Sequence, residues 1–192
     1  MIPLIIVVTI IAVFSAWKLF SRSAYETASY TVIESESPFE VRDYPDLMMA
    51  TTNSDFQSQG RDGSFMRLFR YISGNNEPAQ KIAMTTPVFM EPDANNEQSQ
   101  MGFVVPESVV KNGIPAPSGE NVTIRQRHGG KFAVIRFAGE LNEATRTGNE
   151  KRLREWMKTK KLTGAEIAES AGYDAPFTPG FLRRNEVLIR LK

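Results

Sequence analysis

The longest apolar run of the chain lies at its N-terminus. Ile2 to Trp17 carries no charged residue, and Leu19 and Phe20 extend the apolar character further. About twenty residues in an α-helix rise roughly 30 Å, which matches the hydrocarbon core of a bilayer. The pattern therefore predicts an uncleaved transmembrane anchor over residues 1–22.

The charges that flank this run predict its orientation. Lys18 and Arg22 follow the apolar residues, and the positive-inside rule then places the remainder of the chain on the cytoplasmic side of a membrane. A cleaved signal peptide is the alternative, but such a peptide carries positive charge before its apolar run. We expect a polar linker over residues 23–29 and a single folded domain over residues 30–192.

After the linker, apolar and polar residues alternate with a period of two in several short runs, which predicts β-strands. Pro87 interrupts one of these runs and cannot donate a hydrogen bond to a sheet, so that strand is expected at an edge or with a bulge. The runs are 30–33, 39–44, 47–52, 81–90, 101–106, 122–127, 131–137 and 183–191.

Two longer segments have a helical pattern instead. Within residues 60–74, apolar side chains recur three or four positions apart, which predicts an amphipathic helix. Asn142 is a good N-cap residue and predicts a second helix that ends near Lys160. A short helical segment is also expected over residues 165–171. The apolar face of the first helix consists of Phe65, Leu68, Phe69 and Ile72.

The order strand–strand–helix–strand–strand occurs twice, over approximately residues 30–106 and 121–192. In the second copy, His128-Gly129-Gly130 predicts a hairpin between two strands. Each sheet needs a helix to cover one face. The predicted fold is therefore α+β, a distorted, mostly antiparallel β-barrel or curved sheet with two main helices, preceded by the transmembrane helix.

Composition excludes several classes of function. The net charge is only +1, without the basic stripe that nucleic-acid binding needs. The chain has no cysteine, which excludes disulfides, thiolate catalysis and cysteine-ligated metal. His128 is the single histidine and lies in a predicted turn, and the sequence contains no nucleophile-elbow, phosphate-loop or zinc-protease motif. We predict no catalytic residues, and a single histidine without cysteine argues against a zinc or iron site.

The helix over residues 60–74 offers a candidate groove for a flat apolar ligand that carries carboxylates. Phe65 and Phe69 offer an aromatic surface, and Arg70 offers a cation for a carboxylate. The alternative is that the apolar face only covers the sheet.

Three motifs in order resemble the SOUL haem-binding-protein family: GNNEPAQKIAMTTPV at 74–88, PAPSGENVTI at 115–124 and AGYDAPFTPGFLRRNEVLIRL at 171–191. The resemblance covers most of the chain from Tyr30 to Leu191. It implies a distorted barrel of two related halves and a pocket for haem or another porphyrin. Carried onto this sequence, the pocket would use Phe65, Phe69 and Arg70, with Tyr173 and Phe177 on the opposite side. The iron of a bound haem is expected to be weakly ligated or bound by Met66, Tyr71 or water, because cysteine is absent and the histidine is remote in sequence.

Three functions remain open. The first is a membrane-anchored, non-covalent haem or tetrapyrrole binder that serves buffering, delivery or sensing. The second is an enzyme on the same scaffold that degrades or modifies a tetrapyrrole or another flat apolar molecule. The third is an interaction module with a vestigial pocket. The absence of a catalytic set favours the first.

Overall fold

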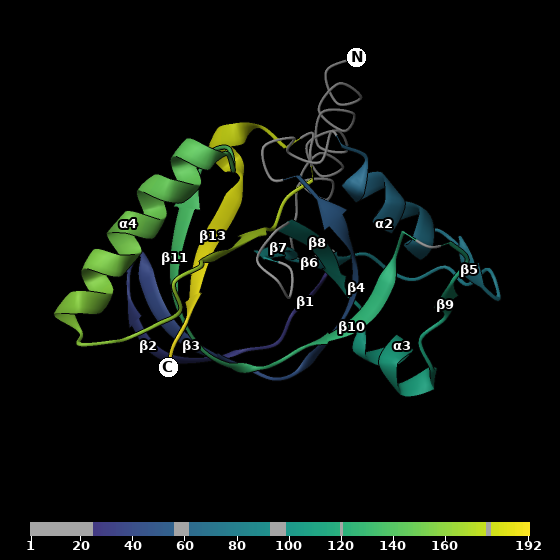
Figure 1. The fold of residues 1–192 in the computed structure, drawn as a ribbon, viewed down its shortest axis with the longest axis horizontal. Coiled ribbons are helices and arrows are strands. Elements are labelled where there is room, and N and C mark those ends of the chain that lie inside the picture. The colour runs from purple at the N-terminus through teal and green to yellow at the C-terminus, as the bar shows by residue number, and fades with distance from the viewer. Residues whose placement is uncertain (1–24, 56–61, 93–98, 120, 176–177) are drawn as a thin grey trace, which may run out of the picture.

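The computed structural model of the chain describes residues 25–55, 62–92, 99–119, 121–175 and 178–192 (Figure 1). The predicted anchor over residues 1–22 lies outside these ranges. Within them, no helix is both long and apolar enough to cross a membrane. The anchor, the linker and the cytoplasmic orientation therefore stay predictions.

One curved, antiparallel sheet of nine strands forms the body of the described chain (Figure 1). Its strands are β2 (Thr31–Glu36), β3 (Phe39–Tyr44), β4 (Leu47–Ser54), β7 (Val88–Pro92), β8 (Ser99–Val104), β10 (Thr123–Arg127), β11 (Gly130–Ala138), β12 (Glu169–Gly172) and β13 (Arg184–Arg190). Their order is β10-β4-β8-β7-β12-β13-β11-β3-β2. The predicted α+β class and curved antiparallel sheet are confirmed. The barrel is wrong, because β10 and β2 do not pair and the sheet stays open.

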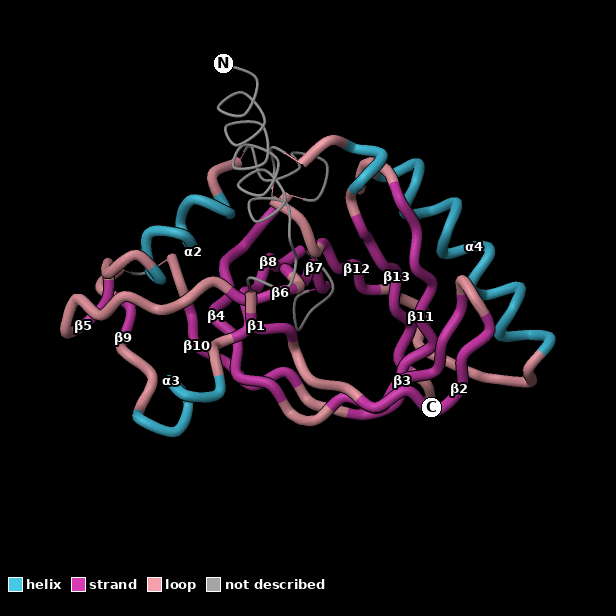
Figure 2. Tube along the Cα trace, turned by 180° about the vertical axis from the view of Figure 1, so that it is seen from behind, coloured by secondary structure: helices cyan, strands magenta, loops and turns pink. Residues whose placement is uncertain are grey.

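Helices cover the outer face of the sheet (Figure 2). The two predicted main helices are present: α2 (Ser64–Ile72) packs on β4 and β8, and α4 (Glu143–Thr159) packs on β11 and β13. The described residues add a short helix, α3 (Glu107–Asn112), and a 3₁₀ turn, η3 (Gly180–Leu182). Two small strand pairs lie beside the sheet, β1 (Glu26–Thr27) with β6 (Thr85–Thr86) and β5 (Asn76–Glu77) with β9 (Ala116–Pro117).

The strand order is symmetrical about the central β7–β12 pair. One half reads β7-β8-β4-β10 and the other reads β12-β13-β11-β3, so each half takes its outer strand from the other half of the sequence. The chain crosses between the halves where β3 leads into β4 and where β10 leads into β11. The repeat boundaries near 30–106 and 121–192 stay a prediction, which this symmetry supports.

The hairpin predicted at His128-Gly129-Gly130 is wrong, since β10 pairs with β4 while β11 pairs with β13 and β3. Gly129 instead allows the backbone of another segment to pack closely against it. A Cβ on Gly129 would lie 2.3 Å from the carbonyl oxygen of Tyr44, in the other crossing segment. The Asp46 carboxylate accepts a hydrogen bond from the Gly129 amide at 2.7 Å. Glycine therefore lets the two crossings pack backbone against backbone.

Two further sequence predictions concern strands in the middle of the sheet. Pro87 interrupts its run, between β6 and β7, but the edge alternative is wrong, because β7 pairs with both β8 and β12. The helical segment expected over residues 165–171 is wrong where Glu169–Gly172 forms β12, between β7 and β13. Pairing on both sides outweighs the local preference of this alanine-rich segment.

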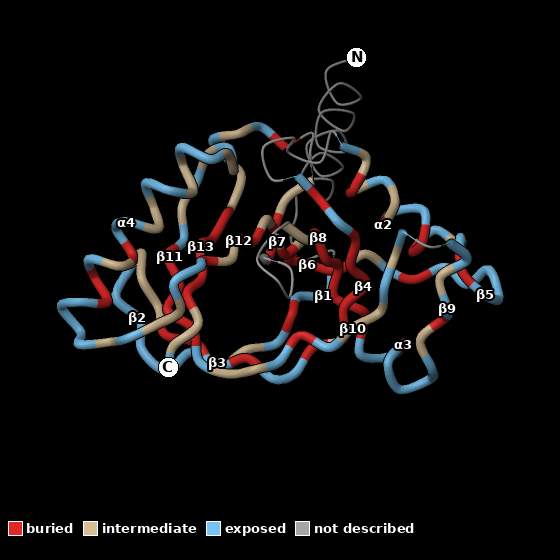
Figure 3. The backbone as a smooth tube through the Cα atoms, viewed as in Figure 1, coloured by how far each residue is buried: buried red, intermediate tan, exposed pale blue. Residues whose placement is uncertain are grey.

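The buried hydrophobic residues form three clusters, and they follow the strands and the inner sides of the helices (Figure 3). On α4, Leu153, Trp156 and Met157 are buried as the sequence predicts. Asn142 caps this helix through the amide of Thr145, and Thr145 caps in return, each at 3.0 Å. The concave face of the sheet is filled by aromatic and aliphatic side chains together with buried charges, described below.

Candidate functional site

The start of α2 is tied firmly to β4. Gly63 precedes the helix with a left-handed backbone, φ 82°, and the Asp62 carboxylate accepts a hydrogen bond from the Ser64 amide at 3.0 Å. Arg67 donates to the hydroxyl of Thr52 at 3.0 Å and to the carbonyl of Asn53 at 2.6 Å. These bonds fix the direction in which the helix side chains point.

One helix both covers the sheet and presents an aromatic surface. Leu68, Tyr71 and Ile72 are buried against the strands. Phe65 is half-buried, whereas Phe69 is 43% exposed and Met66 is 47% exposed. Covering the sheet is thus the role of the buried residues, and the binding role of Phe65 and Phe69 stays a prediction.

An apolar cavity of about 210 Å³ lies beside the aromatic surface of α2. The rings of Phe65 and Phe69 are parallel, with an interplanar angle of 13° and centroids 6.2 Å apart. They form one wall together with Met84, from the segment before β6. The remaining lining consists of Tyr25, Thr86, Val88, Gly172, Tyr173, Asp174 and Ala175.

Tyr173, directly after β12, also lines the cavity, and a hydrogen bond fixes its hydroxyl. Its side chain is 3% exposed, and its hydroxyl donates a hydrogen bond to Glu186 at 2.9 Å. Burial raises the pKa of Tyr173 well above that of an ordinary tyrosine, so the hydroxyl keeps its proton. Phe65, Phe69 and Tyr173, predicted together, thus line one cavity. Phe177 lies outside the described residues.

Three other candidate residues do not line the apolar cavity. Arg70 is exposed and lines a separate hollow of about 120 Å³ with Arg67 and Tyr71. The hydroxyl of Tyr71 is buried and donates to the Pro115 carbonyl at 2.9 Å, so it points away from the Phe69 surface. Met66 projects into solvent. A helix turns by about 100° per residue, which separates Arg70 from the neighbouring Phe69.

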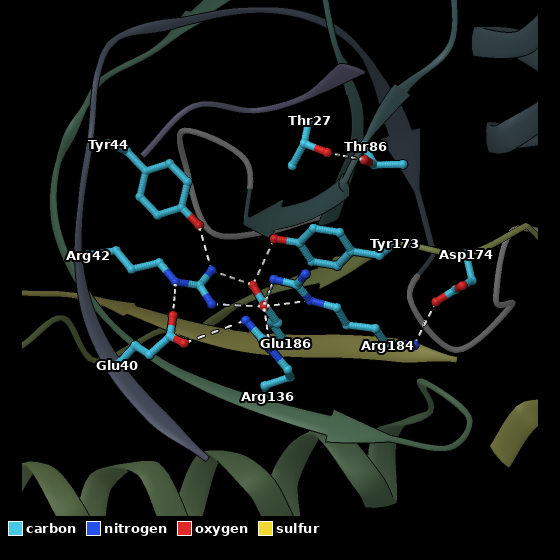
Figure 4. Close-up of polar contacts among 10 residues, drawn as sticks. All are labelled: Thr27, Glu40, Arg42, Tyr44, Thr86, Arg136, Tyr173, Asp174, Arg184 and Glu186. Carbon is cyan, nitrogen blue, oxygen red and sulfur yellow. Dashed lines mark hydrogen bonds and ion pairs between the residues drawn. The ribbon is translucent and has the colours of Figure 1, made fainter. Parts of the chain in front are cut away.

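A buried charged cluster fills the concave face behind Tyr173 (Figure 4). Arg42 makes a two-point contact with Glu186 at 2.7 and 2.9 Å, and both side chains are fully buried. Burial alone would raise the pKa of Glu186, but hydrogen bonds and charge from Arg42 and Arg184 outweigh it and hold the pKa below the ordinary value. Burial raises the pKa of Tyr44, which accepts a bond from Arg42, to about 12.

A second buried cluster lies farther along the same face. Arg127 is 2% exposed, contacts Glu91 at 2.6 Å and Glu169 at 2.5 Å, and stacks over the rings of Phe89 and Phe132. Burial raises the pKa of Glu169, and the charge of Arg127 offsets this effect only in part. Within the described residues, no group of three or more acidic, histidine or cysteine side chains is arranged to hold a metal ion.

Sequence reasoning missed both clusters. The available signal was the presence of charged residues at inward positions of alternating strands, such as Arg42 two residues before Tyr44 and Glu186 two before Leu188. Such positions mark either an error in strand register or a buried ion pair. The partners themselves are 144 residues apart and could not be matched from one sequence.

The family model described as SOUL heme-binding protein matches residues 25–190. The chain belongs to this family. Among relatives, Heme-binding protein 1 of Mus musculus is 30% identical over 129 residues, 64% of this chain and 67% of that protein. Heme-binding protein 1 of Xenopus tropicalis is 27% identical over 156 residues, 78% of this chain and 81% of that protein.

Solved structures share the fold of this SOUL-family chain at low identity. A crystal structure titled as a hydrolase from Listeria innocua has a TM-score of 0.56 and 12% identity, and covers 83% of this chain and 94% of its own. The EcmrR C-terminal domain has a TM-score of 0.56 and 10% identity, over 85% and 98% of the two chains. At such identities the likeness concerns the fold alone.

Proposed function

We propose that this SOUL-family chain binds haem or a related tetrapyrrole non-covalently at the apolar cavity beside α2. The observation that carries the proposal is the parallel Phe65–Phe69 pair, which is partly solvent-exposed at the edge of that cavity. An exposed aromatic pair is costly to leave in water and suits stacking against a flat ring. Membership of the family and the names of the relatives point to the same ligand.

The size of the cavity determines how a tetrapyrrole would be held. At about 210 Å³ it is smaller than the roughly 300–1,000 Å³ typical of sites that enclose a ligand. One edge of the ring would enter between Phe65 and Tyr173. The rest would lie over the exposed faces of Phe69 and Met66, with its rim in water.

The rim carboxylates would pair with Arg70. Its guanidinium has no hydrogen-bond or ion-pair partner among the described residues, and a long arginine side chain can reach across one helix turn. The described lining of the apolar cavity contains a single charged residue, the acidic Asp174. The basic rim of the site would therefore come from the neighbouring hollow.

The iron of a bound haem would contribute little to affinity. His128 is exposed in the crossing between β10 and β11, and the Tyr71 hydroxyl is bonded to Pro115. Met66, at the edge of the surface, or water would be the remaining ligand. Ring burial and carboxylate pairing would then dominate, and an iron-free porphyrin would bind nearly as well as haem.

The predicted anchor gives this function a location. With residues 1–22 in a membrane and the domain on its cytoplasmic side, the chain would buffer, deliver or sense a tetrapyrrole next to a bilayer, into which such ligands partition. Protease added to intact cells should then spare the domain. Digestion of the domain under these conditions, or a mature N-terminus near Ser23, would contradict this topology.

The direct experiment is a haemin titration of the full-length chain, followed by Soret absorbance over several hours. A saturable Soret shift that stays constant supports non-covalent binding. Progressive bleaching would instead support the enzyme alternative. The absence of any saturable shift would refute the proposal.

A further inference from the structure

A larger pocket lies away from α2, where the β2–β3 turn, the end of β11 and η3 meet. Its volume is about 500 Å³, within the usual range for small-molecule sites. Its residues are Ser35, Ser37, Pro38, Glu40, Arg136, Phe137, Ala138, Phe181, Leu182, Arg183 and Arg184. None of these lines the apolar cavity beside α2.

The mouth of this pocket combines apolar surface with hydrogen-bonding groups. Phe181 is 78% exposed, the most exposed large apolar side chain among the described residues, and Leu182 next to it is 49% exposed. Ser35 and Ser37 bring hydroxyl groups to the same pocket. An aromatic side chain this exposed beside a large pocket is a surface that a ligand would cover.

The floor of the pocket is positively charged. Arg136 precedes Phe137 on β11 and belongs to the cluster of Figure 4, on the sheet face away from α4. The ion pairs of that cluster join Arg42, Arg136 and Arg184 to Glu40 and Glu186. The pocket lining itself contains three arginines, Arg136, Arg183 and Arg184, against one carboxylate, Glu40.

Arg136 is the cation that is held least tightly. It approaches Glu40 and Glu186 only at 3.5 Å, while Arg42 approaches the same two residues at 2.6 and 2.7 Å and Arg184 approaches Glu186 at 2.7 Å. Its side chain is 44% exposed and donates no hydrogen bond to any described residue. The five N–H donors of a guanidinium match a carboxylate well. Both carboxylates near Arg136 are already satisfied by other arginines.

We propose that this pocket is a second ligand site, for a small amphiphile that bears one carboxylate on an aromatic or aliphatic body. The carboxylate would bind Arg136, with the serine hydroxyls as further donors, and the apolar body would lie against Phe181 and Leu182. The site is separate from the tetrapyrrole cavity and does not depend on the proposed function.

The test uses a ligand pair that differs only in charge, 2-naphthoate and 2-naphthamide, titrated calorimetrically into the full-length chain in nanodiscs. Empty nanodiscs provide the blank. We expect naphthoate to bind saturably and at least tenfold more tightly than naphthamide. Equal binding of the two compounds, or no saturable binding of naphthoate, would overturn the proposal.

Variants then locate the site. Arg136→Gln should remove most of the preference for naphthoate and leave naphthamide unchanged, because only the charge is lost. Phe181→Ala, at a side chain that is mostly in solvent, should weaken the binding of both compounds at least threefold. Arg70→Gln is the matched control in the other hollow and should change neither. If Phe69→Ala or Arg70→Gln abolishes naphthoate binding while Arg136→Gln does not, the ligand binds at α2 and the assignment is wrong.

Discussion

The two halves of the sheet are matched in topology but differ in how their helices are used. On one half, α4 runs for 17 residues from a reciprocal cap, and its apolar residues Leu153, Trp156 and Met157 are all buried. On the other half, α2 has nine residues, begins after a left-handed glycine, and leaves Phe69 and Met66 nearly half exposed. An apolar cavity lies beside α2.

This difference separates side chains that stabilise the fold from side chains that are available to a ligand. Side chains that are fully buried under a helix contribute to stability, whereas exposed aromatic residues beside a cavity contribute little to stability and are available to a partner. The buried residues of α4 therefore stabilise the fold, whereas the exposed residues of α2 form the surface at which we propose that a tetrapyrrole binds. Substitutions in the two halves should separate stability from affinity.

The largest expected effect comes from the buried charges in the α4 half. Glu186→Gln removes the charge that makes a two-point contact with the buried Arg42, which then keeps only Glu40 as a carboxylate partner. It should lower the free energy of unfolding at pH 7 by about 3–5 kcal/mol. Glu169→Gln is the matched control on the neighbouring strand. It should cost clearly less, because burial already raises the pKa of Glu169 and disfavours its charge. Urea unfolding of both variants measures the difference, and equal costs would contradict it.

The same two carboxylates should respond to pH in opposite directions. The folded state lowers the pKa of Glu186, so its contribution to stability is present above the ordinary value of 4.5 and is lost as the pH falls through the lower folded value. The folded state raises the pKa of Glu169, so its contribution grows as the pH falls from neutral through the raised value. Unfolding titrations should show the cost of Glu186→Gln shrinking below pH 4.5. A constant cost would argue against this pairing.

Truncation under α4 is the next largest effect. Leu153→Ala removes a fully buried side chain and should destabilise the fold by about 2–5 kcal/mol. Haemin affinity of the folded protein should be unchanged, because the site lies on the other half. Thermal unfolding and a Soret titration below the transition check both statements. A loss of affinity as large as the loss of stability would mean that the halves do not act independently.

The converse result is expected on α2. Phe69→Ala should weaken haemin binding by about tenfold, since the exposed ring supplies stacking area, and should change stability by about 1 kcal/mol or less. The Soret titration and urea unfolding used above provide the comparison. A variant that binds haemin normally but unfolds easily would place Phe69 in the core rather than in the site.

Charge at the rim should have an effect of similar or smaller size. Arg70→Glu should weaken both haemin and iron-free porphyrin by about tenfold, because one charge-assisted hydrogen bond is replaced by repulsion. His128→Ala is the control with the smallest expected effect, none, since this side chain is exposed in the crossing between β10 and β11. Soret titrations of both variants measure the two affinities. Loss of binding in His128→Ala alone would point to iron ligation at another site.

Local patterns predicted the elements well and their pairing poorly. Asn142 and the stripe of Phe65 and Phe69 act within a few residues, so a cap and a helical face could be found from sequence. The course of the backbone at Gly129 depends on its packing against Asp46, more than eighty residues earlier in the chain. The same pair of glycines is equally typical of a hairpin, so the sequence could not distinguish the two. The ion pair of Arg42 and Glu186 is still less local.

The candidate site was predicted to the same extent. Phe65, Phe69 and Tyr173 line one cavity. The first two could be predicted from helical spacing, and Tyr173 from the resemblance of the C-terminal motif. Arg70 lies in the adjacent hollow, since one residue along a helix changes the direction of a side chain by about 100°. The sequence pattern places Arg70 near the aromatic face of the helix but does not show which hollow its guanidinium enters.

The most direct test of tetrapyrrole binding at α2 is the methyl NMR spectrum of methionine-labelled full-length chain, recorded with and without iron-free protoporphyrin. A porphyrin ring strongly shifts the signals of methyl groups that lie over it. We predict that Met84, which lines the cavity, shifts most and that Met66, exposed on α2 next to Phe65 in sequence, shifts next, while Met157, buried in α4, stays in place. Unchanged Met84 and Met66 signals at saturating porphyrin would contradict the assignment of the site to α2.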